Sequence, residues 1–82
     1  MQNYSNLCGK SGVRTFEIGS DFIKVMFSTG AVYAYTYRSA GVEKVEEMKS
    51  LALRGCGLNS FIMKYAKYNY ERWGSFYNYI EQ

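Results

Sequence analysis

The stretch FIKVMFSTGAVYAYTY, residues 22–37, decides how this chain folds. Two runs rich in β-branched and aromatic residues flank a short segment that ends in glycine, which is typical of a β-hairpin. Upstream, VRTFEI alternates well enough for another strand, and GSD forms the turn between them. The sequence therefore predicts a three-stranded antiparallel meander over residues 13–18, 22–27 and 31–37.

The length of the hairpin turn determines which side chains face the core. A two-residue turn that ends at Gly30 leaves three tyrosines on the outer face beside Lys24, namely Tyr33, Tyr35 and Tyr37. A three-residue loop, with Gly30 in a bulge, shifts the pairing by one residue and sends Tyr33 and Tyr35 into the core. Because a one-residue slip exchanges the two faces of a strand, the sequence leaves both alternatives open.

Two helices follow the hairpin in this prediction. Ser39 is a favourable N-cap and Gly55 a favourable stop for the first, whose buried face is Val42, Val45, Met48, Leu51 and Ala52. Asn59 caps the second, whose buried stripe is Leu58, Phe61, Ile62, Tyr65 and Ala66. The expected fold class is therefore α+β: a three-stranded antiparallel β-meander followed by two α-helices, with an aromatic C-terminal tail.

The small size of the chain requires support for the fold. A domain of 82 residues buries only about 60–65% of its unfolded surface, and it usually needs disulfides, a metal or a partner subunit. Two cysteines, Cys8 and Cys56, do not make a disulfide framework, and without histidine they make no zinc site. We therefore expect free thiols, a cytoplasmic location, no metal and a partner subunit, with a Cys8–Cys56 bridge as the alternative.

The chain is expected to divide into three parts. Residues 1–11 predict a flexible N-terminal arm, residues 12–70 hold the domain, and residues 71–82 form the aromatic tail. Nine tyrosines exceed what so small a core can hold, and large exposed apolar patches usually mark interfaces. The tail therefore predicts a homo-oligomer contact, with docking on its own sheet as the alternative; its contact residues are Trp73, Phe76, Tyr77 and Tyr79. No run is long enough to predict a membrane span.

The stretch RGCGLNSFI, residues 54–62, is a candidate phosphate site. Gly55 and Gly57 allow the backbone to direct N–H groups into one concavity. Asn59 begins a helix, whose N-terminus attracts anions, and Arg54 can clamp a phosphate. The alternative is a tight turn between two helices, and the spacing matches neither the P-loop nor the dinucleotide-binding fingerprint.

Aromatic and basic residues together suggest a nucleic-acid ligand. Bases would stack on the three tyrosines of the last strand if these face outward, with packing beneath the helices as the alternative. Phosphates would contact basic residues that interleave with the later tyrosines, unless these only form a solvated helix face: Lys64, Lys67 and Arg72. A net charge of +3 permits anionic partners without requiring them.

The segment SGVRTFEIGSDFIKVMFSTGAVYAYTY, followed by a helix and GLNSFI, resembles the KTSC family. This family is named for the C-terminus of some lysyl-tRNA synthetases and also occurs alone in bacterial and phage proteins. Its Y-x-Y signature matches Tyr33 and Tyr35, and its F-x-x-G strand end matches Phe27 and Gly30, so the resemblance covers about residues 12–70. It implies a small α+β domain for which RNA binding is suggested. The arm and the tail are extra, and the proline expected after Y-x-Y is absent.

These observations predict a non-catalytic module for a base-and-phosphate ligand, with RNA or a nucleotide as the partner. We expect no enzyme and no cofactor, because histidine is absent and Cys56 lacks a visible orienting base. The alternative is a phage-encoded counter-defence protein in the host cytoplasm. It would sequester a nucleotide immune signal between subunits, using Arg54 and the turn at residues 55–59, or block a host defence protein by direct contact.

Overall fold

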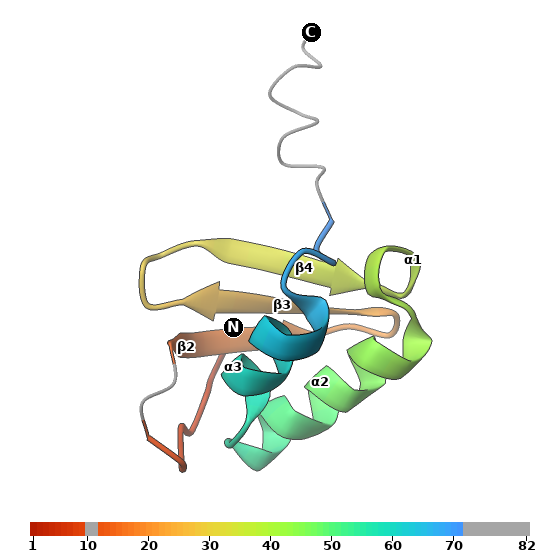
Figure 1. Cartoon of the computed structure of the whole chain (residues 1–82). Helices are drawn as coiled ribbons and strands as arrows, with labels where there is room; N and C mark the ends of the chain where they lie inside the picture. The colour runs from red at the N-terminus through yellow and green to blue at the C-terminus, as the bar shows by residue number, and fades with distance from the viewer. Residues whose placement is uncertain (10–11, 72–82) are drawn as a thin grey trace, which may run out of the picture.

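The computed structural model describes residues 1–9 and 12–71 (Figure 1). In chain order the elements are β1 (Gln2–Asn3), β2 (Val13–Ile18), β3 (Phe22–Phe27), β4 (Val32–Thr36), α1 (Tyr37–Ala40), α2 (Val42–Arg54), α3 (Leu58–Phe61) and the π-helix η1 (Ile62–Ala66). The strands form one antiparallel sheet in the order β1-β2-β3-β4. The predicted α+β class is confirmed, but the sheet has a fourth strand, because Gln2–Asn3 pairs with β2.

The β3–β4 hairpin adopts the three-residue alternative. The Phe27 N–H donates to the Ala31 carbonyl (2.9 Å), and Gly30 has a φ of 93°, a left-handed conformation that favours glycine. Val25 consequently pairs with Tyr33, whereas a two-residue turn would pair it with Ala34. The register turns the Y-x-Y tyrosines towards the helices, and it leaves Lys24 on the opposite face of the sheet.

The core lies between the sheet and the helices α2, α3 and η1, which lie on the same side of the sheet (Figure 1). The strands contribute alternate residues because successive side chains of a strand point to opposite faces. Its buried residues are Tyr4, Val13, Phe16, Ile23, Val25, Tyr35, Val45, Met48, Leu51, Ala52, Leu58, Ile62 and Ala66. The helical members confirm most of both predicted apolar faces, whereas Val42 is exposed.

Backbone groups of β4 alternate between β3 and the outer edge of the sheet. The Glu71 N–H donates to the Ala34 carbonyl (2.6 Å), so the backbone groups of Ala34 point away from β3. Because this direction alternates along an antiparallel strand, Tyr33 and Tyr35 direct their N–H groups towards β3. The amides of these two tyrosines therefore report on the inner ladder of the sheet.

A short helix, α1, precedes the predicted one. The Thr36 hydroxyl accepts from the Ser39 N–H (2.9 Å), and the Ser39 hydroxyl accepts from the Thr36 N–H (3.0 Å), which is a capping box. Gly41, with a φ of 95°, then separates α1 from α2. Ser39 was predicted to cap the long helix; it belongs instead to the first turn of α1, because the glycine after Ala40 redirects the chain.

The second predicted helix begins at Leu58, directly after Gly57, and continues from α3 into η1. Asn59 lies inside this helix, so the prediction that it is the N-cap is wrong. A π-helix has more residues per turn than an α-helix, so Tyr65, three residues after Ile62, lies further round the helix from Ile62 than it would in an α-helix. Ile62 and Ala66 remain buried, whereas Tyr65 is 52% exposed. Within residues 1–9 and 12–71, no helix has the length and apolar character needed to cross a membrane.

Candidate functional site

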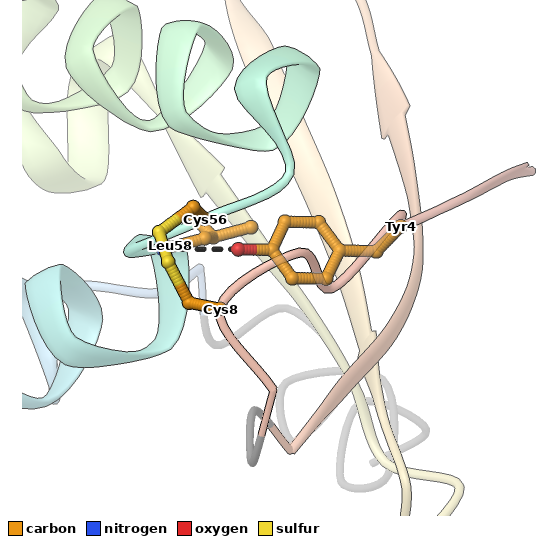
Figure 2. The surroundings of a disulfide bond; sticks show 4 residues. All are labelled: Tyr4, Cys8, Cys56 and Leu58. Atoms are coloured by element: carbon orange, nitrogen blue, oxygen red, sulfur yellow. Dashed lines mark hydrogen bonds between the residues drawn. A yellow bond between two sulfur atoms is a disulfide. The ribbon is translucent and has the colours of Figure 1, made fainter.

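The turn after α2 packs directly on the N-terminal segment (Figure 2). Gly55 ends α2 as predicted, with a φ of 80° and its N–H directed to the Leu51 carbonyl (3.0 Å). The Gly55 carbonyl accepts from the Leu7 N–H (2.6 Å). A Cβ at position 55 would lie 2.8 Å from the Ser5 Cβ. Glycine is therefore required here for both its conformation and its lack of a side chain.

Cys8 and Cys56 form a disulfide across this contact, with their Cα atoms 5.1 Å apart (Figure 2). The expectation of free thiols is therefore wrong for this structure. The two cysteines are 48 residues apart in the sequence, so their contact is not evident from it. They meet because β1 pairs with β2 and the Leu7 N–H then donates to the Gly55 carbonyl in the turn after α2. The cytoplasmic location, expected from the same cysteine count, stays a prediction.

Tyr4 fixes the same contact from the inside. Its ring is 6% exposed and meets Phe16 edge to face, with ring centroids 6.4 Å apart. Its hydroxyl accepts a hydrogen bond from the Leu58 N–H (3.3 Å; Figure 2), and its own N–H donates to the Arg14 carbonyl (2.9 Å). Residues 1–9 are thus part of the fold rather than the flexible arm that the polar sequence predicted.

The residues of the predicted phosphate site have structural roles in this turn. The structure brings Gly55, Gly57 and Asn59 together, but the Gly55 N–H closes α2 and the Leu58 N–H donates to Tyr4. Two of the N–H groups that would cradle a phosphate are therefore already used within the protein. Arg54 is exposed at the end of α2. The tight-turn alternative accounts for the glycines without a ligand.

A cleft of about 380 Å³ opens beside the disulfide. Both cysteines line it, together with the polar side chains of Asn6, Asn59 and Ser60. Cys8 is exposed and Cys56 is half-buried. The disulfide is therefore accessible from solvent on the side of this cleft.

The predicted base-stacking tyrosines of β4 do not form a platform. Tyr35 is 1% exposed, and burial raises the pKa of its hydroxyl well above the ordinary value, with a further rise from the charge of Tyr33 and Tyr70. Tyr33 is half-buried, with its ring centroid 4.6 Å from that of Tyr70 and 5.7 Å from that of Phe27. We refer to Tyr33, Tyr35 and Tyr70 as the inner tyrosine cluster.

Tyr37 lies apart from that cluster, at the first turn of α1. Its hydroxyl donates to a Glu46 carboxylate oxygen (2.6 Å), and this hydrogen bond raises the pKa of Tyr37. Lys49 donates to the same oxygen (2.8 Å), which lowers the pKa of Glu46, and its ammonium lies 5.6 Å from the Tyr37 ring centroid. These contacts join α1 to α2, so Tyr37 has a structural role without a ligand.

A second group of tyrosines is exposed on η1 and the turn that follows it. Tyr65 is 52% exposed and Tyr68 is 68% exposed. The Lys64 ammonium lies 5.4 Å from the Tyr65 ring centroid, and the Lys67 ammonium lies 5.5 Å from that of Tyr68. We call these four residues the tyrosine–lysine surface. The sequence identified its lysines, but it assigned Tyr65 to the buried stripe because apolar spacing does not reveal a π-helix.

The neighbouring helix gives one border of this surface a negative charge. A groove of about 270 Å³ runs between α2 and Tyr65, and it is lined by Glu43, Glu47, Lys44 and Phe61. The Lys44 ammonium donates to the Asn69 side chain (2.9 Å), so its position is fixed within the fold. The Phe61 and Tyr65 rings are 5.1 Å apart, which supports Tyr65 from the groove side.

Several predicted residues lie outside the described part of the chain. They are Arg72 of the phosphate-contacting set and the oligomer-contact residues Trp73, Phe76, Tyr77 and Tyr79. Among residues 1–9 and 12–71, no three Cys, Asp or Glu side chains gather as they would around a metal ion. Comparison of the chain with family models, curated proteins and solved structures found no match. The resemblance to KTSC domains stays a prediction from the Y-x-Y motif and its neighbours.

Proposed function

We propose that this protein is a non-catalytic module that binds single-stranded RNA through the tyrosine–lysine surface. One observation carries the proposal: two tyrosines are more than half exposed, and each has a lysine ammonium within 5.5 Å of its ring centroid. Sequence-tolerant single-strand binders combine exposed rings, which stack bases, with cations that follow the phosphates.

The energies involved are sufficient for a weak, salt-sensitive complex. Stacking of one base on an aromatic side chain contributes about 1–3 kcal/mol, and the two rings together therefore about 2–6 kcal/mol. The ring of Tyr65 is already held in place by Phe61, so less conformational freedom is lost on binding. The net charge of +3 adds an attraction that does not depend on sequence.

The two glutamates of the groove between α2 and Tyr65 favour one side of the surface for the RNA backbone. Phosphates near Glu43 and Glu47 would be repelled, whereas phosphates near Lys64 and Lys67 would be attracted. The strand is therefore expected to place its bases on the tyrosine rings and its backbone on the side of the lysines, away from α2.

Fluorescence anisotropy with a labelled single-stranded RNA tests the proposal. We expect Tyr65→Ala and Tyr68→Ala each to weaken binding by at least about fivefold, because each removes one stacking ring. Val42→Ala is the matched control, since it removes an exposed apolar side chain from α2, and circular dichroism checks that each variant folds. Wild-type affinity in both tyrosine variants, or equal losses in the control, would contradict the proposal.

Salt dependence gives a second readout of the same site. Two lysine–phosphate contacts predict that affinity falls about sevenfold between about 50 mM and about 200 mM monovalent salt. Lys64→Gln together with Lys67→Gln should flatten this dependence. Arg14→Gln, at an exposed position on β2, should leave it unchanged.

A further inference from the structure

We propose that the Cys8–Cys56 disulfide is a site of thiol–disulfide exchange, and that its reduction by a dithiol releases residues 1–9 from the rest of the fold. This inference does not depend on RNA binding. It rests on where the bond lies, on what else holds the N-terminal segment, and on what that segment covers.

The disulfide is positioned for attack by an external thiolate. Figure 2 shows it at the junction between the N-terminal segment and the turn after α2. Both cysteines line the cleft of about 380 Å³, and Cys8 is the more exposed of the two. Accessibility is one of the properties that separate exchangeable disulfides from structural ones.

The exchange is a balanced two-electron reaction. A thiolate of the dithiol attacks the Cys8 Sγ, the Sγ–Sγ bond breaks, and Cys56 leaves as a thiolate. The second thiol of the reductant then attacks the mixed disulfide at the reductant's own sulfur and releases Cys8. The dithiol is oxidised to a cyclic disulfide, and its two protons account for the two cysteine thiols formed.

Besides the disulfide, a short strand pairing, backbone hydrogen bonds and one buried ring hold the N-terminal segment in place. β1 contains only two residues, and a pairing this short is not stable by itself. The Tyr4 and Leu7 N–H groups donate to the Arg14 and Gly55 carbonyls, and the Tyr4 ring is buried. The disulfide holds Cys8 beside the turn after α2, one residue from the Leu7 N–H that donates to Gly55, so its loss lowers the effective concentration of that contact.

Release would uncover a strand edge and an apolar site. β1 covers the outer backbone groups of β2 around Thr15 and Phe16, and an uncovered edge can pair with another strand. Departure of Tyr4 would also expose the Phe16 ring and leave the Leu58 N–H without its acceptor. The redox state of one bond therefore controls whether this edge of the sheet is available.

Amide hydrogen exchange on the full chain tests whether reduction of the disulfide releases residues 1–9. Tyr4 and Leu7 are the reporters, and Tyr33 and Tyr35 are the controls because their N–H groups face β3. After dithiothreitol treatment, we expect reporter protection factors below about 10 and control factors that stay above about 100. The double variant Cys8→Ser/Cys56→Ser should show the reduced pattern without reductant and should not respond to it.

Four outcomes would overturn the proposal. Titration of two free thiols before any reduction would show that the bond is absent. Failure of dithiothreitol to generate thiols in the folded protein would show that the bond is inaccessible. Unchanged protection of Tyr4 and Leu7 after complete reduction would show that other contacts hold the segment. Loss of protection at Tyr33 and Tyr35 to the same extent would show that the bond supports the whole fold rather than one segment.

Discussion

The inner tyrosine cluster and the tyrosine–lysine surface use the same residue type for opposite purposes. Tyr35 is 1% exposed and packs against other rings, whereas Tyr68 is 68% exposed beside a lysine. From sequence, the Y-x-Y tyrosines were the more attractive ligand platform if they faced outward, and Tyr65 was assigned to the core. The structure decides the first question in favour of the core and reverses the second assignment, which shows that ring count alone does not locate a binding surface.

Two backbone details produce this arrangement of the tyrosines. The left-handed conformation of Gly30 allows a three-residue hairpin loop, and the resulting register turns Tyr33 and Tyr35 inward. The wide π-helical turn at Ile62–Ala66 keeps Ile62 and Ala66 buried while Tyr65 moves to the surface. Each detail changes which tyrosine side chains are buried, although the spacing of apolar residues in the sequence stays the same.

The largest expected effect separates the two tyrosine groups by stability. Tyr35→Ala should lower the free energy of unfolding by about 3–5 kcal/mol, because it removes a fully buried ring and leaves a cavity. Tyr68→Ala should change it by less than about 0.5 kcal/mol, because that ring is exposed. Urea denaturation followed by circular dichroism measures both. Similar losses in the two variants would remove the distinction between core and surface tyrosines.

A smaller effect is expected at the turn that sets the register. Gly30→Val should destabilise the protein by about 1–3 kcal/mol, because a β-branched residue is strained at a φ of 93°. No atom lies within 4 Å of the added Cβ, so the loss reports conformation rather than a clash. Gly12→Ala is the control, since its Cβ would make an ordinary contact 4.0 Å from Phe27. Equal stabilities in thermal melts of these variants would argue against the bulged loop.

The acidic border of the tyrosine–lysine surface predicts a gain of binding. Glu43→Gln combined with Glu47→Gln removes two negative charges from the groove beside Tyr65, and should raise RNA affinity by about two- to fivefold at low salt. Glu17→Gln, on β2, is the control for the loss of one negative charge away from the groove. An equal gain in the control would show that the effect comes from net charge alone. Unchanged affinity in the double variant would show that the RNA does not bind near this border.

The smallest effect concerns alkaline pH. Burial raises the folded-state pKa of Tyr35 above its value in the unfolded chain, so its contribution to stability is complete below about pH 10 and is lost as pH rises above that value. Wild-type protein should therefore lose stability progressively as pH rises above about 10, as measured by urea denaturation. Tyr35→Phe, which keeps the ring and removes the ionisable group, should lose less. An identical pH dependence in both proteins would exclude this contribution.

The sequence predicted the elements better than their contacts. Local signals located β2, β3 and β4, and Gly55 was correctly identified as the end of α2 because a left-handed glycine is a strong local stop. β1 was missed because two polar residues carry no strand pattern, and the Cys8–Cys56 contact was given only as an alternative because it joins segments 48 residues apart. The exposure of Tyr65 depended on helix type, which side-chain periodicity does not encode.

The most direct test of the proposed function compares the tyrosine rings during one titration. Ring carbon–proton NMR signals of the folded protein can be followed while single-stranded RNA is added. We predict that the signals of Tyr65 and Tyr68 shift progressively and saturate, whereas those of Tyr33 and Tyr35 stay in place. Saturating RNA that leaves Tyr65 and Tyr68 unmoved, or shifts confined to other rings, would contradict RNA binding at the tyrosine–lysine surface.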